Sequence, residues 1–396
     1  MHDKTKQDSK KNVVWKWATS TLGLCAVSTL VFAQPGGSKA VSVASTEQLE
    51  GKSYLDLQAI IQEGEKLSAQ QASALGARLV FNPKDFASRL RLLGYYERLS
   101  IQRQPPRQEI PELAEVALGF IEHHPRSQMA GEVLLLVTVH SPSAYEQGAK
   151  LWMQHVQANP KDPKILGHAG AYLMGTVLQF QHRDQGEAML QEARKLDPKN
   201  PEWPEKLAEL YDNDRTRSRA NPAARTAAAT KELEALEEAY RLTSDTHKAT
   251  LRPRGQHVFY GLVSAAFFAG ETEKAKAYGT NLLKSVNKEE ESWNYGNAIH
   301  RANVLLGHIA LRENRIDQAA RHLLEGGKTP GSPQLNSFGP DMSLAKALLE
   351  KGQRETVVQY LDLCASFWKM DKGRLAKWKQ AIQAGQAPDF GQSGQL

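Results

Sequence analysis

The C-terminal third of the chain carries polar and aromatic side chains of the kinds that bind a peptide. On the helical register described below, seven residues are predicted to form a basic, hydrogen-bonding strip: His257, Tyr260, Trp293, Asn297, Arg301, His308 and Arg312. A guanidinium group forms paired hydrogen bonds with a carboxylate, so this strip could receive a peptide C-terminus or an acidic side chain. The alternative interpretation is that the two arginines are solvated and that His308 is a hydrogen-bonded interior histidine.

A long irregular segment follows the strip. Residues 326–340 (GGKTPGSPQLNSFGP) are predicted to be a loop, which at fifteen residues is long for a connection between helices. Loops of this length often carry function, and four side chains are candidates for binding: Gln334, Asn336, Ser337 and Phe338. The alternative is structural, with Leu335 and Phe338 sealing an irregular junction between helices.

The sequence has no catalytic or metal-binding pattern. The adjacent His123 and His124 would point to different faces of a helix, and no H-E-x-x-H or G-x-S-x-G motif occurs. Cys364 has no cysteine partner once Cys25 leaves with the N-terminal segment, and its small-residue position is typical of buried packing. We therefore expect a protein with no metal, no cofactor and no enzymatic activity of its own.

The elements that would position these side chains are predicted to be helices. Between Tyr54 and Lys369 apolar residues recur at intervals of three and four, as on one face of an α-helix. A proline just past a helix cannot continue it, and four prolines interrupt the pattern at intervals of about 35 to 42 residues: Pro83, Pro125, Pro160 and Pro198. Further breaks are predicted after residues 245, 288 and 338. Units of this length, each with two helices, are typical of an α-helical solenoid.

A spacing of thirteen residues repeats along the chain and would join the two helices of one unit. It occurs in four pairs: Leu135 and Gly148, Leu262 and Ala275, Leu306 and Ala319, and Leu344 and Val357. With the Leu306-Gly307 pair, and with Leu207-Ala208 followed by Tyr211, these residues resemble the tetratricopeptide repeat. The resemblance implies an all-α, right-handed solenoid of about eight helical hairpins over residues 53–383, with a C-terminal capping helix near 372–383.

Residues 296–368 are also similar to a group of uncharacterised exported helical-repeat proteins of environmental bacteria. The similarity lies in GNAIHRANVLLGHIALRENRIDQAARHLLEGG, SPQLNSFGPDMSLAKALLEKG and VVQYLDLCASFW. It implies a shared module and no particular activity. The segments that flank the repeats are predicted to be irregular, with 34–52 as a flexible lead-in and 384–396 as a disordered tail.

The N-terminus has the layout of a secretory signal peptide. Residues 1–17 are rich in lysine, an apolar run extends from Ala18 to Phe32, and small residues precede a cut after Ala33. The run is shorter than the ~20 residues of a membrane-spanning helix. We expect a periplasmic or secreted bacterial protein that lacks residues 1–33. The alternative is an uncleaved inner-membrane anchor that leaves the rest of the chain facing the periplasm.

Charge argues against a polyanionic partner. Loss of the five lysines and two aspartates of residues 1–33 lowers the formal net charge from +6 to about +3. The arginine-rich stretch at 215–225 is predicted to be an exposed linker and not a nucleic-acid site.

Two functions from different classes fit these observations. The favoured hypothesis is an exported scaffold that binds a protein or peptide on its concave face, with membrane contact only through the N-terminal segment if it is not cleaved. The alternative is an all-helical toroid, an enzyme or binding protein acting on envelope polysaccharide. An enzyme of that kind would need two carboxylates ~5–9.5 Å apart across a sugar cleft.

Overall fold

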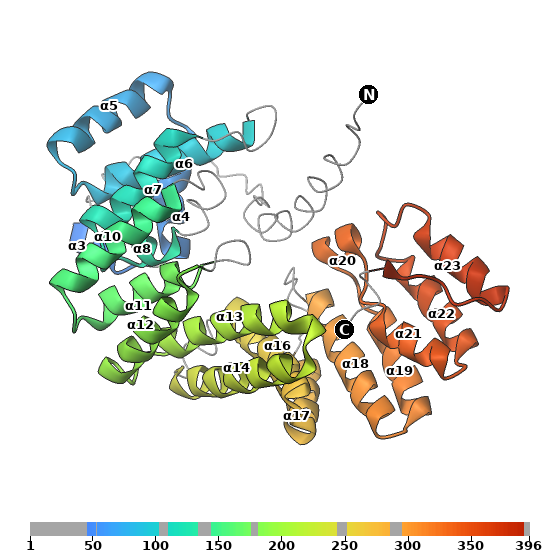
Figure 1. Cartoon of the computed structure of the whole chain (residues 1–396). Helices are drawn as coiled ribbons and strands as arrows, with labels where there is room; N and C mark the ends of the chain where they lie inside the picture. Colours follow the sequence, from blue (N-terminus) through green and yellow to red (C-terminus); the bar gives the residue numbers. More distant parts are fainter. Residues whose placement is uncertain are drawn as a thin grey trace, which may run out of the picture.

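The structure is a computed structural model that describes residues 46–52, 54–102, 110–133, 144–175, 181–243, 252–285 and 295–391. Every regular element in these ranges is a helix, as expected for an all-α protein (Figure 1). The helices are α3 (Thr46–Glu50), α4 (Tyr54–Glu65), α5 (Ala69–Phe81), α6 (Phe86–Gln102), α7 (Pro111–His123), α8 (Gln128–Glu132), α10 (Ala144–Ala158), α11 (Pro163–Leu173), α12 (Arg183–Leu196), α13 (Glu202–Arg217), the 3₁₀ turn η1 (Ser218–Ala220), α14 (Pro222–Leu242), α16 (Arg252–Ala269), α17 (Thr272–Ser285), α18 (Tyr295–Arg312), α19 (Ile316–Gly327), α20 (Pro333–Phe338), α21 (Ser343–Glu350), α22 (Arg354–Cys364) and α23 (Arg374–Gln383).

Helices that follow one another in the chain pack side by side. The most extensive contacts join α13 to α14, α18 to α19 and α11 to α12, and α16 packs on both α14 and α17. The succession of helices follows a curved path in Figure 1, from the blue N-terminal helices through green and yellow to the red C-terminal ones. Contacts between neighbours in sequence therefore account for most of the packing.

The predicted helix ends are confirmed at all four prolines. Pro83, Pro125, Pro160 and Pro198 each lie between two helices, because proline has no N–H to donate to a preceding turn. A side chain caps the following helix after Pro125, where Ser127 accepts the backbone N–H of Ala130, and after Pro160, where Asp162 accepts the backbone N–H groups of Lys164 and Ile165.

The residues of the thirteen-residue spacing are buried wherever the structure describes them; Leu135 lies outside the described residues. Leu262, Ala275 and Ala319 are fully buried, and Leu306 is 8% exposed. Gly307 lies against the next pair of helices, since a Cβ placed on it would be 2.2 Å from Leu344 Cδ2. These small residues allow the close approach that the spacing predicted.

The interior consists of two clusters of buried side chains that meet on α18. Leu305 and Ile309 belong to the cluster that begins at Leu49, and Val304 and Ala310 belong to the one that ends at Phe390. Helix α18 is therefore covered on opposite sides, by earlier helices and by later ones.

Two segments predicted to be irregular are ordered in part. In the expected lead-in, residues 46–50 form α3, where Leu49 is only 5% exposed and the Glu50 carboxylate pairs with His124. The apolar leucine and the carboxylate each find a buried partner, which holds this short helix on the fold.

The expected tail is likewise ordered up to Gly391, beyond the closing helix α23. Phe390 packs edge-on against Trp378 with 5.0 Å between ring centroids, and Trp378 Nε1 donates to the Asp389 carbonyl at 3.1 Å. An aromatic pair and a buried indole hydrogen bond are sufficient to fix the segment.

The segment 326–340 contains a helix that was expected to be loop. Its first two residues end α19, and residues 333–338 form α20, whose N-terminus is capped by the Ser332 hydroxyl. Leu335 is buried in α20, as the structural alternative predicted, whereas Phe338 is 48% exposed.

Cys364 is buried, as expected, and burial raises the pKa of its thiol to about 12. The predicted signal peptide lies outside the described residues. Among the helices that the structure describes, none is long and apolar enough to cross a membrane.

Gly94→Ala tests how closely α4 and α6 approach each other. A Cβ on Gly94 would lie 1.9 Å from the Ile61 carbonyl oxygen, so the helices must separate, and we expect a loss of about 1–3 kcal/mol of unfolding free energy. Denaturant unfolding followed by circular dichroism measures it. The matched control is Gly76→Ala in α5, where an added Cβ meets no atom within 4 Å, and its stability should stay constant or rise by about 1 kcal/mol. Equal midpoints for both variants would contradict this packing.

Candidate functional site

A small cavity lies where α18 meets α16 and residues 329–341. These residues include α20 and are called the α20 segment below. The volume of the cavity is about 170 Å³, and nine residues line it: Tyr260, Asn297, His300, Arg301, Gln334, Leu335, Phe338, Gly339 and Asp341. The cavity thus brings together five of the eleven residues predicted to bind a partner, three from the strip and two from the loop. It is the candidate site.

Arg301 is the positive charge of the cavity. Its guanidinium carbon lies 5.7 Å from the ring centroid of Tyr260, and Nη1 lies 3.5 Å from Asp341 Oδ2. The Arg301 side chain is 27% exposed, and its buried Nε has no hydrogen-bond partner among the described residues. The ion pair with Asp341 is long enough to leave donor groups of Arg301 available to a ligand.

Asp341 is the negative charge of the cavity, and three neighbours hold it in place. Its backbone N–H donates to His300 Nε2 at 2.9 Å, and its Oδ1 accepts the Ser343 N–H at 2.8 Å. The Tyr360 hydroxyl donates to the Asp341 carbonyl at 3.4 Å. Asp341 therefore presents only Oδ2 toward Arg301.

His300 connects this aspartate to the interior. Because Nε2 accepts a hydrogen bond from Asp341, the ring proton is on Nδ1, which donates to the Gly326 carbonyl at 3.3 Å. Burial lowers the pKa of His300, so the ring is neutral. The sequence identified neither His300 nor Asp341, because their roles arise from a contact between α18 and the segment after α20.

The polar rim of the cavity comes from Asn297 and the α20 segment. Asn297 Nδ2 donates to Gln334 Oε1 at 3.2 Å, and Asn297 Oδ1 accepts the Ser332 hydroxyl at 2.7 Å. The Thr329 hydroxyl donates to the Gly296 carbonyl at 2.8 Å, which holds the segment on α18. Within the described part of the chain, the amide nitrogen of Gln334 has no partner.

The other predicted residues lie elsewhere. His308 and Arg312 lie further along α18, outside the cavity lining. His308 Nε2 forms a hydrogen bond with the Ser343 hydroxyl at 3.0 Å, and the guanidinium carbon of Arg312 lies 3.9 Å from the ring centroid of Phe267. Asn336 Oδ1 accepts the Lys369 N–H at 3.0 Å, and Ser337 is exposed outside the cavity lining. The Trp293 residue and the side chain of His257 lie outside the described part of the structure.

His308 is an interior histidine and not a cation of the strip. Burial, with Arg312 and Arg301 nearby, lowers its pKa to about 4. Its surroundings therefore support the alternative interpretation, that His308 is a hydrogen-bonded interior histidine.

The arginine-rich stretch is exposed at Arg217 and Arg219, as the sequence predicted, but its two ends are packed on the fold. Arg215 is buried, where its Nε donates to Glu232 Oε2 at 2.6 Å, and burial raises the pKa of that carboxyl to about 7. The guanidinium carbon of Arg225 lies 3.8 Å from the centroid of Phe268. These arginines pack α13 and α14 onto α16. No group of three potential ligands among the described residues could hold a metal ion.

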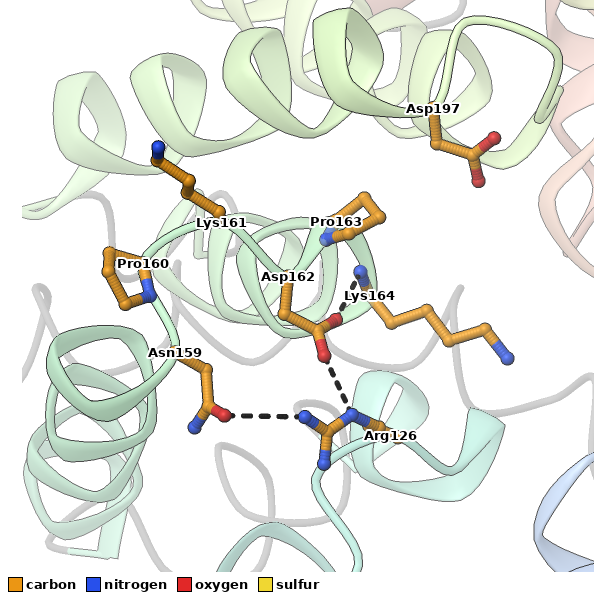
Figure 2. A pocket seen from close by; sticks show the side chains of 8 residues that line it. All are labelled: Arg126, Asn159, Pro160, Lys161, Asp162, Pro163, Lys164 and Asp197. Atoms are coloured by element: carbon orange, nitrogen blue, oxygen red, sulfur yellow. Dashed lines mark hydrogen bonds and ion pairs between the residues drawn. The ribbon is translucent and has the colours of Figure 1, made fainter.

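A second, open hollow of about 670 Å³ lies at the loops between helix pairs (Figure 2). Figure 2 shows the Arg126 guanidinium between Asn159 and Asp162, with Nε 2.7 Å from Asp162 Oδ2. These hydrogen bonds and the N-terminal cap of α11 lower the pKa of Asp162, although burial opposes them. Because Arg126 and Asp162, which pair with each other, already support the fold, we assign this hollow a structural role.

A scan against models of protein families finds no match for this chain, and a search of curated proteins finds no relative. The candidate site therefore rests on its own geometry.

Asp162→Ala tests the role of the hollow at the helix pairs. The change removes the cap of α11 and the partner of Arg126, so we expect a loss of about 1–2 kcal/mol of unfolding free energy in denaturant titrations. Lys164→Ala, on the same turn, leaves both interactions in place and should unfold as the parent does. A parent-like midpoint for Asp162→Ala would show that the cap contributes nothing.

His308→Asn tests the neutral interior histidine. Between about pH 6.5 and pH 4 the unfolded chain binds a proton at His308 and the folded chain does not, so acid destabilises the folded state across this window. The variant should lose less stability than the parent when the pH falls from 7 to 5. Melting temperatures across this range measure the difference, and parallel curves for both proteins would contradict the assignment.

Proposed function

We propose that this protein is an exported scaffold that binds a segment of a protein partner, with the cavity between α16, α18 and α20 as its anchoring site. The observation that carries the proposal is the convergence of an arginine, an aspartate and two side-chain amides around a hollow large enough for one side chain. Such a cavity, lined by both apolar and polar side chains, is typical of an anchoring pocket for a ligand.

The proposed architecture is a right-handed solenoid of about eight tetratricopeptide-like hairpins. The packing of successive helices on their neighbours supports it, as do the buried residues of the thirteen-residue spacing. In such an array the first helices of the pairs form the concave surface, and α16 and α18 would be two of them. The extra helix α20 is a departure from a regular repeat, and it contributes three cavity residues.

The proposed compartment is the bacterial periplasm or the exterior, reached through the N-terminal signal sequence. The proposal includes no catalysis. The polysaccharide alternative has less support at this site, because one carboxylate, that of Asp341, lines the described cavity where a glycosidase needs two.

Affinity capture tests the proposed function. The purified protein, a double variant Arg301→Ala/Gln334→Ala and a control Lys379→Ala would be incubated with envelope extract of the source organism and read out by mass spectrometry. Lys379 pairs with the exposed Asp362 on a different surface. We expect a partner enriched by the parent and the control and reduced at least several-fold by the double variant, since that variant lacks the main cavity donors. Equal enrichment by all three baits would refute the cavity as the anchoring site.

A further inference from the structure

The charges that line the cavity balance each other. Arg301 contributes one positive charge and Asp341 one negative charge, and their side chains face each other at 3.5 Å. The remaining lining residues are neutral, because His300 is buried with a lowered pKa and the others are amides, aromatic groups, leucine and glycine. A carboxylate that approached Arg301 would also approach Asp341, and like charges at such distances repel strongly in a half-buried site.

The unused hydrogen-bonding groups of the cavity form a complementary pair. The amide nitrogen of Gln334 is a donor without a partner among the described residues, and the partly exposed Arg301 guanidinium adds donors that its long ion pair with Asp341 leaves available. Asp341 Oδ2 is an acceptor, and its neighbour Arg301 Nη1 lies at the long distance of 3.5 Å. A ligand group that accepts a hydrogen bond on one side and donates one on the other would satisfy both the donors and the Asp341 carboxylate.

The apolar residues of the cavity match a short aliphatic stem. Leu335, which is buried, and Phe338, which is 48% exposed, both line the cavity. A volume of about 170 Å³ is sufficient for one medium-sized side chain.

We infer that the cavity selects a side-chain amide, that of a glutamine or asparagine in the bound peptide, over a carboxylate. The amide oxygen accepts from Arg301 and Gln334, the amide nitrogen donates to Asp341 Oδ2, and the methylene groups lie on Leu335 and Phe338. This inference rests on the proposed function and replaces the carboxylate that the sequence suggested. Asp341 acts as the residue that determines specificity, because its charge rejects an acidic side chain.

The test uses arrayed synthetic peptides of random sequence, probed with the full-length protein. Peptides that bind are resynthesised with glutamine, glutamate or methionine at each position, and dissociation constants are measured by fluorescence anisotropy. We expect one anchoring position at which glutamine binds on the order of tenfold more tightly than glutamate or methionine. In Asp341→Asn the order of glutamine and glutamate should reverse, because Arg301 then lacks a negative partner while the asparagine oxygen can still accept from Ser343.

Two further variants keep the test decisive. Asp362→Asn removes an exposed carboxylate on α22 that pairs with Lys379, and the parent preference should persist in it. Gln334→Ala changes a partly exposed residue of α20, and it should weaken binding of the glutamine peptide several-fold even if Asp341→Asn does not fold.

The outcomes separate this inference from the proposed function. Peptides that bind equally well with glutamine and glutamate, or a preference unchanged in a folded Asp341→Asn protein, would overturn the amide inference and leave the scaffold in place. An array with no binding peptide would overturn both, and binding of N-acetylated chitooligosaccharides in its place would favour the polysaccharide alternative. A glutamine preference that reverses in Asp341→Asn and persists in Asp362→Asn would establish the inference.

Discussion

The burial of α18 between two hydrophobic clusters is the constraint on which the rest of the C-terminal half depends. Leu305 and Ile309 contact the earlier helices, and Val304 and Ala310 contact the later ones. A helix covered on opposite sides can expose polar groups only along the strip between the two contacts. Asn297 and Arg301 occupy that strip, so the cavity forms at the seam between the two clusters.

The α20 segment closes this seam through polar contacts made in several places. Thr329 binds the Gly296 carbonyl, Ser332 binds Asn297, and the Asp341 N–H binds His300. A Cβ on Gly296 would lie 1.9 Å from the Gly331 carbonyl oxygen, so the segment lies directly on the backbone of α18. The neutral, buried His300 matters most, because it fixes the acidic residue opposite Arg301 without adding a charge of its own.

Arginine side chains are structural elsewhere in this region. The rings of Phe267 and Phe268, neighbours on α16, are covered by Arg312 and Arg225, and Arg215 is buried against Glu232. Planar guanidinium groups stack on aromatic rings at little cost in hydration, which explains why these positions have arginine. The candidate site is therefore distinguished by the Asp341 carboxylate and the cavity that Arg301 faces, and not by the presence of an arginine.

The sequence by itself determined most of the helices, their ends at the prolines and the burial of the residues in the thirteen-residue spacing, because these depend on periodicity and on contacts between neighbours in the chain; the short helices α3 and α20 were missed. It also singled out five residues that line one cavity, since polar and irregular segments stand out against a regular helical pattern: Tyr260, Asn297, Arg301, Gln334 and Phe338. The ordered structure of residues 46–50 and 384–391 was missed, because single residues hold these segments. Leu49 packs into the cluster formed by later helices, and Phe390 packs on Trp378 of α23.

Only the tertiary structure decided which of the predicted side chains meet. The pairing of Arg301 with Asp341 and the role of His300 require α18 and the segment after α20 to lie together, and no local pattern encodes that contact. The neutral state of His308 likewise follows from burial among several elements. Charge and hydrogen-bonding state depend on the full environment of a group, whereas helix formation depends on its neighbours in sequence.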